Sequence, residues 1–436
     1  MNMENQLKKL NNAVSALQGS QARTRLLRLF DEGSFVEIDR FARDADMPSQ
    51  AVVGYGTVEG CPVYAFSQDK QVYRGAIGKA QAAKICKAYQ LASQNGAPLV
   101  GVFDSDGAKL NEGIDAMDAI AEILFASNNL SGVVPQIAVV AGACVGSSAI
   151  IAANSDFVVM SKDADYYLNP GDQNAAASIM AEDADAAIDM ARRLVSLLPS
   201  NNLDVPAAFD IVDMQVKACS SIDDVINAVA DDEIINIGQG KNQTVLASVG
   251  GNICGLLTLA QDKISADESS RLARFIRLCD AFSLPVISFV DTAGFENLQG
   301  AAKLSHAYAE ATTVKITTII GKAYGAAYIA AAGKSAGADV VLAWPTAVVL
   351  PLAPETAIHI FENDKLADMK DPVEDRKKLA EEYAQANGDV FAAASNGAIT
   401  DIVSTNQTKS KLIALLKMFE SKRVSRNPKK HSNIVL

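Results

Sequence analysis

Histidine is scarce in this chain, and its cysteines do not stand in pairs. Among 436 residues there are three histidines, His306, His359 and His431, and no two of them have the spacing of metal ligands. The six cysteines are scattered without a CxxC motif, which argues against a zinc ribbon or a disulfide framework and fits a reducing cytoplasm. We therefore expect no metal site in this chain.

Three further absences narrow the class of protein. The longest apolar stretch, residues 133–153, is interrupted by Pro135, Gln136 and two serines, so it is predicted to form a core strand and helix rather than a membrane span. The first residues, MNMENQLKKLNN, lack the apolar core of a signal peptide, so we expect a cytoplasmic protein. The net charge is −12 and basic residues are dense only at 422–430, which argues against binding to nucleic acid.

A nucleophilic serine is one reading of the Gly146-Ser147-Ser148 segment. A serine hydrolase needs a base within reach of the nucleophile and a third group that orients the base. The one interior histidine that could serve, His306, falls on a predicted helix in the other half of the chain. Small residues that allow close packing are the simpler interpretation of this segment.

The strongest positive feature is an internal duplication. The first copy reads APLVGVFDSDGAK, PQIAVVAGACVGSSAIIAA and DADYYLNP, and the second reads LPVISFVDTAGFE, VKITTIIGKAYGAAYIAAA and WPTAVVLPLAP. Asp104 then corresponds to Asp291, Gly142 to Gly321, and Gly146 to Gly325. The aspartates have a larger offset than the glycines, so the second copy has a shorter segment between its strand and its glycine loop.

Strands and helices alternate along the predicted chain, which indicates an α/β fold with a parallel sheet and helical crossovers. The first residues, 2–20, form an amphipathic polar helix, and residues 203–240 are the expected inter-domain region. Further helices are predicted at 22–30, 75–95, 113–127, 175–194, 222–230, 269–282 and 370–387, and strands at 51–58, 61–69, 99–103, 136–140, 244–248 and 253–259.

The two glycine loops are candidate oxyanion sites. Small residues at the start of a helix, directly after a buried strand, direct several backbone N–H groups to one point. Such a point can hold a thioester oxygen as it becomes an enolate. Packing alone explains small residues there equally well, but the duplication favours function, because two oxyanion sites suit a reaction in which both partners develop negative charge.

A series of motifs in fixed order resembles the carboxyltransferase family of biotin-dependent acyl-CoA carboxylases and decarboxylases. The resemblance covers almost everything after residue 20, and LPSNN, KAYGAAY and the stretch from CDAF to DTAGF are its most specific parts. The other matching segments are ARTRLLRLFDEGSFVEID, CPVYAFSQDKQVYRGAIG, DSDGAKLNEG, SGVVPQIAVVAGACVG, AKLSHAYAEAT, AWPTA and KHSNI.

The resemblance implies two tandem crotonase-like spiral domains, residues 1–230 for acyl-CoA and residues 231–436 for biotin. It also implies a hexamer whose active sites form where the first domain of one subunit meets the second domain of another. Carboxybiotin would release CO2, its ureido anion would remove the α-proton of the acyl-CoA, and the enolate would attack CO2. The protein would supply positioning and oxyanion stabilisation rather than an acid–base pair.

The resemblance also assigns site residues. The oxyanion pairs fall on Gly146 and Ser147 in the first domain and on Ala326 and Ala327 in the second. The remaining substrate and cofactor positions are Gly75, Gly78, Gly107, Ala108, Gly294, Phe295, Tyr324, Gly325 and Ile329, the last of which could line an acyl pocket or belong to the core.

This chain departs from the family pattern at a few places. Glycine is frequent in the family at 147 and 326, and Asp106 replaces a usual glycine. The segment after DTAGF and the segment AQDKISADESS are both shorter than their counterparts. These departures keep a second reading open, a non-catalytic paralogue that acts as a scaffold or regulatory subunit. A third reading, a crotonase-type hydratase or isomerase, needs a glutamate at the thioester site, for which Glu112 is the nearby candidate.

The expected partners follow from segments that the chain does not contain. It has no AMKM-type biotinylation sequence and no ATP-binding domain, so biotin should arrive on a separate carrier protein. The direction of the reaction is open: a biotin carboxylase subunit would make it forward, and a membrane decarboxylase subunit would make it reverse. In the second case the protein would be peripheral to a membrane complex.

Overall fold

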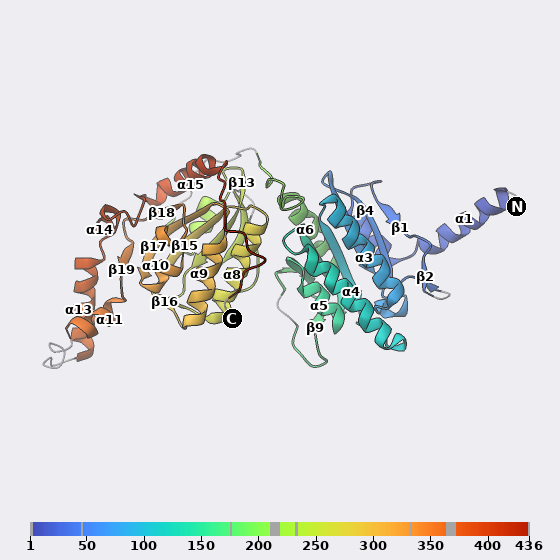
Figure 1. The fold of residues 1–436 in the computed structure, drawn as a ribbon, viewed down its shortest axis with the longest axis horizontal. Helices are drawn as coiled ribbons and strands as arrows, with labels where there is room; N and C mark the ends of the chain where they lie inside the picture. Colours follow the sequence, from blue (N-terminus) through green and yellow to red (C-terminus); the bar gives the residue numbers. More distant parts are fainter. Residues whose placement is uncertain are drawn as a thin grey trace. The chain divides into compact units, whose positions relative to one another are not determined.

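The computed structural model divides the chain into two compact units, Met1–Ala207 and Ala208–Leu436 (Figure 1). It describes residues 3–44, 47–174, 177–209, 219–231, 234–331, 333–362 and 372–434. The sequence predicted the division at 230/231, which is too late, because Val225 and Ile226 are buried in the core of the second unit. Part of the predicted inter-domain region, residues 210–218, lies outside the described residues.

The first unit alternates strands and helices as predicted. Its elements are α1 (Met3–Leu17), α2 (Gln21–Leu29), β1 (Val36–Ile38), β2 (Arg43–Asp44), β3 (Met47–Pro48), β4 (Ala51–Val58), β5 (Cys61–Gln68), η1 (Tyr73–Gly75), α3 (Lys79–Asn95), β6 (Leu99–Ser105), η2 (Leu110–Glu112), α4 (Ile114–Leu130), β7 (Gln136–Val145), α5 (Ser147–Ala153), β8 (Phe157–Ser161), β9 (Asp165–Tyr167), β10 (Ile179–Ala181) and α6 (Ala184–Leu197).

The second unit repeats this order and adds helices near its end. Its elements are α7 (Val225–Val229), β11 (Ile234–Asn236), β12 (Thr244–Val249), β13 (Asn252–Leu259), β14 (Lys263–Ile264), α8 (Ala266–Ala281), β15 (Val286–Thr292), β16 (Gly294–Phe295), α9 (Leu298–Glu310), β17 (Lys315–Tyr324), α10 (Ala326–Ala330), η3 (Lys334–Ala336), β18 (Val340–Ala343), β19 (Val348–Leu350), α11 (Pro354–Phe361), α13 (Pro372–Asn387), α14 (Val390–Ser395), β20 (Asp401–Ile402) and α15 (Thr405–Phe419).

The main sheets of the two units have one topology. In the described part of the chain the first is ordered β1-β4-β5-β6-β7-β8-β10 and the second β11-β12-β13-β15-β17-β18-β20. The first two pairings in each sheet are antiparallel and the others are parallel. In each unit a short strand, β9 or β19, pairs in parallel with the end of the long strand β7 or β17. This strand-by-strand match confirms the duplicated α/β architecture.

Both faces of the first sheet are covered, which explains its uninterrupted apolar strands. All seven residues of β6 are buried, as is typical of a parallel sheet between two helical layers. Helices α3 and α4 pack against one another, and α2 packs against α6. Both α2 and α3 contact β4 and β5, whereas α6 contacts β7 and β8. Phe66, Tyr89 and Phe103 form an aromatic cluster between the sheet and α3, with ring centroids 5.4 and 6.4 Å from that of Phe66.

One predicted helix was wrong at its start. The alanine-rich segment 175–194 was expected to be helical throughout, but residues 179–181 form β10 and α6 begins at Ala184. The side chain of Asp183 accepts a hydrogen bond from the N–H of Ala186 at 2.8 Å, which fixes the helix start by N-capping. Within the described residues, no helix is both long and apolar enough to cross a bilayer.

Candidate functional site

The two glycine loops have the same backbone geometry. Gly146 has φ 61° and ψ −129°, and Gly325 has φ 44° and ψ −108°. This positive-φ conformation favours glycine, because a side chain would be strained there. The N–H of Gly146 donates to the carbonyl oxygen of Tyr167 at 3.0 Å, and that of Gly325 donates to Leu350 at 2.9 Å. Each loop is therefore held by the short parallel strand beside it, β9 or β19.

These hydrogen bonds correct the predicted role of Gly146. Its N–H is already bonded to Tyr167, so it cannot also point at a substrate oxygen. The duplication pairs Ser147 with Ala326 and Ser148 with Ala327, and these residues begin α5 and α10. Their N–H groups are the first of each helix, which have no intrahelical acceptor. Gly146 and Gly325 thus shape the two loops, and the residues that follow them carry the candidate donors.

An aspartate, buried in the first unit and half-buried in the second, fixes the far end of each loop. Asp104 Oδ1 accepts the N–H of Ala143 at 3.1 Å, and Asp291 Oδ1 accepts the N–H of Lys322 at 2.8 Å. The preceding residue is glycine in both copies because a Cβ on Gly142 or Gly321 would overlap the aspartate carboxylate. The carboxylate therefore fills the space that a side chain would need, and it holds strands β6 and β7, or β15 and β17, together at their carboxyl ends.

The two aspartates differ in their partners. Asp104 accepts a charge-assisted hydrogen bond from Arg25 Nη1 at 2.9 Å, with both side chains less than a tenth exposed, and Lys70 Nζ lies 3.8 Å away. Among the described residues, Asp291 has no comparable ion pair. The arginine comes from α2, so the first loop is tied to the opposite helical layer.

The structure brings the predicted positions of the first unit together. A Cβ on Gly75 would overlap the carbonyl oxygen of Asp104, and one on Gly107 would lie 3.0 Å from that of Val145. The same Cβ on Gly107 would lie 3.9 Å from the N of Ser147. Ala108 pairs with Ile77 in an isolated β-bridge. These glycines allow two strand-end loops to lie against the start of α5.

Gly78 and Glu112 form a separate contact at the start of α3. Glu112 accepts the N–H of Lys79 at 2.8 Å and forms an ion pair with Lys109 Nζ at 2.8 Å. A Cβ on Gly78 would overlap the same carboxylate. Glu112 is therefore bound to a helix N-terminus and to a lysine, rather than directed at the glycine loop.

We expect Glu112→Gln to leave carboxyl transfer largely intact. The amide keeps an acceptor for the N–H of Lys79 but loses the ion pair with Lys109, which costs about 1–2 kcal/mol of stability. A hydratase that used Glu112 as its acid–base group would instead lose about 100-fold or more in rate. Parallel assays of crotonyl-CoA hydration and malonyl-CoA decarboxylation with the wild type and this variant separate the two.

In the second unit the predicted positions lie at two adjoining places. Gly294 and Phe295 form β16, which pairs in parallel with β14. Tyr324 ends β17, and burial raises the pKa of its half-buried hydroxyl. Gly325 follows it, and Ile329 on α10 is 63% exposed, so it is not a core residue of this chain.

The two shortened segments of the second unit close against each other. The N–H of Ala293 donates to Asp262 and that of Glu296 to Ile264, each at 2.9 Å. The side chain of Asn297 then caps α9 by accepting the N–H of Gly300 at 2.7 Å. The two segments that were predicted to be short therefore meet in the β14–β16 pair.

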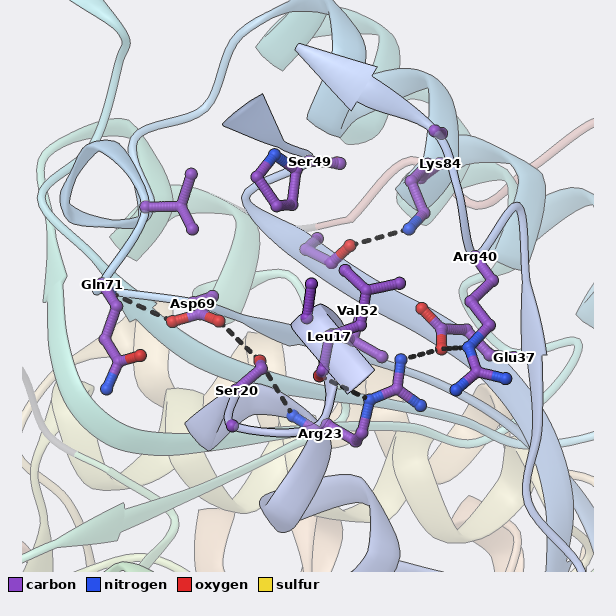
Figure 2. Close-up of a pocket in the computed structure, with 16 residues that line it drawn as sticks. Leu17, Ser20, Arg23, Glu37, Arg40, Ser49, Val52, Asp69, Gln71 and Lys84 are labelled. Carbon is purple, nitrogen blue, oxygen red and sulfur yellow. Dashed lines mark hydrogen bonds and ion pairs between the residues drawn. The ribbon is translucent and has the colours of Figure 1, made fainter. Parts of the chain in front are cut away.

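A cavity of about 260 Å³ lies beside the first unit's loop at 69–72. Figure 2 shows Glu37 and Arg40 on one side and Asp69 on the other. Arg23 and Arg40 both pair with Glu37, whereas Asp69 accepts hydrogen bonds from Ser20 and from the N–H of Gln71. The lining residues are Ala16, Leu17, Gly19, Ser20, Arg23, Glu37, Arg40, Ala42, Pro48, Ser49, Ala51, Val52, Asp69, Gln71, Val72 and Lys84.

Lys84 makes this cavity positive overall. Its Nζ donates to the carbonyl oxygen of Ala51 at 2.9 Å, and burial lowers its pKa. With two arginines it gives three cations against the two carboxylates of Glu37 and Asp69. Local sequence patterns do not indicate this cavity, because its residues come from separate segments between positions 16 and 84.

No group in the described part of the chain gathers three potential metal ligands. His306, the proposed base of the hydrolase reading, has its Nδ1 3.0 Å from Arg277 and 3.6 Å from Glu310 on α9. It is engaged in a surface charge cluster of the second unit.

Comparison with known proteins identifies relatives over nearly the whole chain. The family model described as the carboxyl transferase domain matches residues 18–169 and 170–434. Methylmalonyl-CoA decarboxylase subunit alpha of Propionigenium modestum is 34% identical, covering 95% of this chain and 93% of the relative. Methylmalonyl-CoA carboxyltransferase 12S subunit of Propionibacterium freudenreichii is 33% identical, covering 95% and 92%.

A solved structure of similar form contains a substrate. It is a transcarboxylase 12S hexamer with methylmalonyl-coenzyme A and methylmalonic acid bound, which superposes with a TM-score of 0.91 at 29% identity. The match covers 100% of this chain and 99% of that chain. The whole fold, rather than one unit, is therefore shared.

Proposed function

This chain belongs to the carboxyl transferase family, and we propose that it moves a carboxyl group between carboxybiotin on a carrier protein and a short-chain acyl-CoA. The observation that carries this proposal is the duplicated glycine loop, with one backbone geometry and one aspartate contact in both units. A reaction with two oxyanions needs two such sites. A hydratase or a hydrolase needs one site and a side-chain base.

In the proposed reaction, backbone N–H groups of the protein stabilise the negative charge that develops on the substrates. Ser147 and Ser148 begin α5, and Ala326 and Ala327 begin α10, so each pair directs its first N–H groups away from the helix. Carboxybiotin is a substrate that supplies CO2 and the base for the α-proton. The protein holds the thioester oxygen and the ureido oxygen by hydrogen bonds that strengthen as negative charge develops.

The first unit suits the acyl-CoA end of the reaction. Its cavity next to the loop at 69–72 has an excess of one positive charge, and coenzyme A is a polyanion. We assign biotin to the second unit, where the β14–β16 pair and the exposed Ile329 border the loop at Gly325. The biotin carrier, a biotin carboxylase or a membrane decarboxylase subunit remain the proposed partners.

Decarboxylation with added biotin tests the function. The purified protein is incubated with malonyl-CoA or methylmalonyl-CoA and with free biotin or a biotinylated carrier, and loss of the carboxylated thioester is followed. We expect turnover that requires both biotin and protein. Folded, oligomeric protein that turns over no short acyl-CoA would support the scaffold or regulatory reading instead.

Helix α1 supplies a further prediction about assembly. Its apolar residues Met3, Leu7, Leu10, Val14 and Leu17 alternate at spacings of four and three, and none is buried in this chain. Such spacing is typical of a helix that packs on another helix. Figure 1 shows α1 extending from the body of the first unit. We propose that a second copy of this chain covers this stripe, as part of an oligomer.

The double substitution Leu7→Lys and Leu10→Lys is expected to lower the oligomer mass measured by mass photometry. Burying lysine in a helix seam without a partner disfavours assembly. The matched control is Asn5→Lys with Asn12→Lys, which adds the same charge to exposed positions away from the stripe. Equal masses for both variants would contradict a role of α1 in assembly.

A further inference from the structure

Two residues with side chains adopt a glycine-like backbone conformation at the first glycine loop. Tyr73 has φ 48° and Arg74 has φ 56°, directly before Gly75 with φ 69°. Residues with a Cβ rarely occupy this region, and such strain persists where the surroundings over-determine it. Glycine would adopt both conformations with less strain. We therefore expect the side chains of Tyr73 and Arg74 to make interactions that offset this strain.

Arg74 forms an ion pair with Asp106 on the neighbouring loop. The guanidinium Nε contacts Asp106 Oδ2, and the N–H of Asp106 donates to the carbonyl oxygen of Arg74 at 3.2 Å. The Arg74 side chain is 77% exposed and that of Asp106 is 25% exposed. A pair with an exposed arginine adds little stability, because water already solvates the guanidinium. Stability therefore does not account for an arginine at a strained position.

The pair lies one residue from the candidate donors. Asp106 precedes Gly107, whose Cβ position would lie 3.9 Å from the N of Ser147 and 3.7 Å from its Oγ. The loop that carries Arg74 also lines the positive cavity, at Asp69 and Val72.

The neighbouring lysines are already engaged. Lys109 Nζ contacts the carboxylates of Asp44 and Glu112 and lies 4.5 Å from the centre of the Tyr73 ring. Lys79 pairs with Asp115 at 3.0 Å. Arg74, in contrast, is 77% exposed, and its carboxylate partner among the described residues is Asp106. An exposed guanidinium can contact an anion from solution, because water rather than protein covers most of it.

We propose that Arg74 is an exchangeable anion-binding residue. Its guanidinium releases the carboxylate of Asp106 and then binds an anionic group of the thioester substrate. This inference rests on the proposed function of the site. The planar guanidinium suits a phosphate of coenzyme A or a carboxylate of the acyl group, because it can donate two parallel hydrogen bonds. Asp106 holds the side chain in place before the substrate arrives and competes with it, so it lowers the apparent affinity.

Calorimetric titration with coenzyme A, acetyl-CoA and malonyl-CoA tests the proposal without any turnover of biotin. Arg74→Ala should weaken binding about 10- to 100-fold, since a hydrogen bond to a charged group is lost. Asp106→Asn should strengthen binding, because the competing charge is removed. The opposite signs are the distinctive expectation, since a merely structural ion pair would give losses of the same sign in both variants.

The three probes distinguish the sources of the anion. If Arg74→Ala lowers the affinity for all three probes equally, the anion that Arg74 binds is a phosphate of coenzyme A. If it lowers the affinity for malonyl-CoA alone, the anion is the acyl carboxylate. Arg74→Gly serves as the folding control: it should show the same loss with an unchanged or higher Tm, because glycine relieves the positive φ.

Three results would overturn the proposal: tighter binding in both variants, which would mean that the pair only blocks the loop; weaker binding in both; or no binding of any probe to the wild type. Because binding is measured directly, a protein that binds coenzyme A through Arg74 but fails to decarboxylate with biotin would keep this inference and reject the proposed reaction.

Discussion

Asp104→Ala is expected to lower the free energy of unfolding by about 3–5 kcal/mol, the cost of breaking a buried ion pair from one side. The substitution leaves the guanidinium of Arg25 with its side chain 8% exposed and its ion-pair partner removed. It also removes the acceptor for the N–H of Ala143 and empties the space against Gly142. The first glycine loop should then lose its fixed position, and activity should fall with it.

The internal duplication supplies the matched control. Asp291→Ala removes the same backbone hydrogen bond, to Lys322, from a half-buried carboxylate without the buried arginine. We expect a loss of about 1–2 kcal/mol there, the cost of an unsatisfied hydrogen bond. Circular dichroism in urea gives the total change, and hydrogen exchange of the peptides of β6 and β15 locates it. Equal losses of unfolding free energy in the two variants would show that the ion pair between Arg25 and Asp104 does not stabilise the fold.

The sequence was sufficient for the duplicated architecture because the repeated pattern is local. Each copy places an apolar strand, a glycine loop and a small-residue helix in direct succession, and each strand that the sequence predicted is present. The start of α6 was missed because alanine content favours a helix over 175–194, whereas strand pairing of 179–181 with β8 outweighs that propensity.

The hydrogen-bond and ion-pair partners of the loop residues could not be predicted from the neighbouring sequence. The N–H of Gly146 is bonded to Tyr167, which lies on β9 well beyond the loop, so its role as a donor could not be judged from neighbouring residues. The pair between Arg25 and Asp104 joins positions 79 residues apart. A signal did exist for it: an arginine on the buried face of an otherwise apolar helical pattern needs a carboxylate partner.

The contacts of Asp106 change the interpretation of the departure at this position. An aspartate in place of a usual glycine suggested a disturbed site, and the structure gives that aspartate a partner, Arg74, across the two loops. The shortened segments of the second unit likewise pair with each other as β14 and β16. Both departures are accommodated by compensating contacts, which favours a modified enzyme over a decayed one.

Ala326→Val is expected to reduce biotin-dependent decarboxylation by about 100- to 1,000-fold, the usual cost of losing one oxyanion donor. Ala326 is exposed and follows Gly325 directly at the start of α10. Two added methyl groups on a rigid β-branched side chain would stand where a substrate oxygen must approach the N–H groups of Ala326 and Ala327. The fold should tolerate the change, because the side chain points to solvent.

The control for this variant is Ala153→Val, an exposed alanine at the end of α5 that carries the same added volume away from both loops. It should retain the wild-type rate. Steady-state rates with malonyl-CoA and biotin, together with Tm and oligomer mass, separate a catalytic loss from a folding defect. An Ala326→Val protein with wild-type turnover would remove the second glycine loop from the reaction. A loss in rate at unchanged Tm and mass would mean that these backbone N–H groups face the reacting oxygen, since the substitution changes no charge and no hydrogen-bonding side chain.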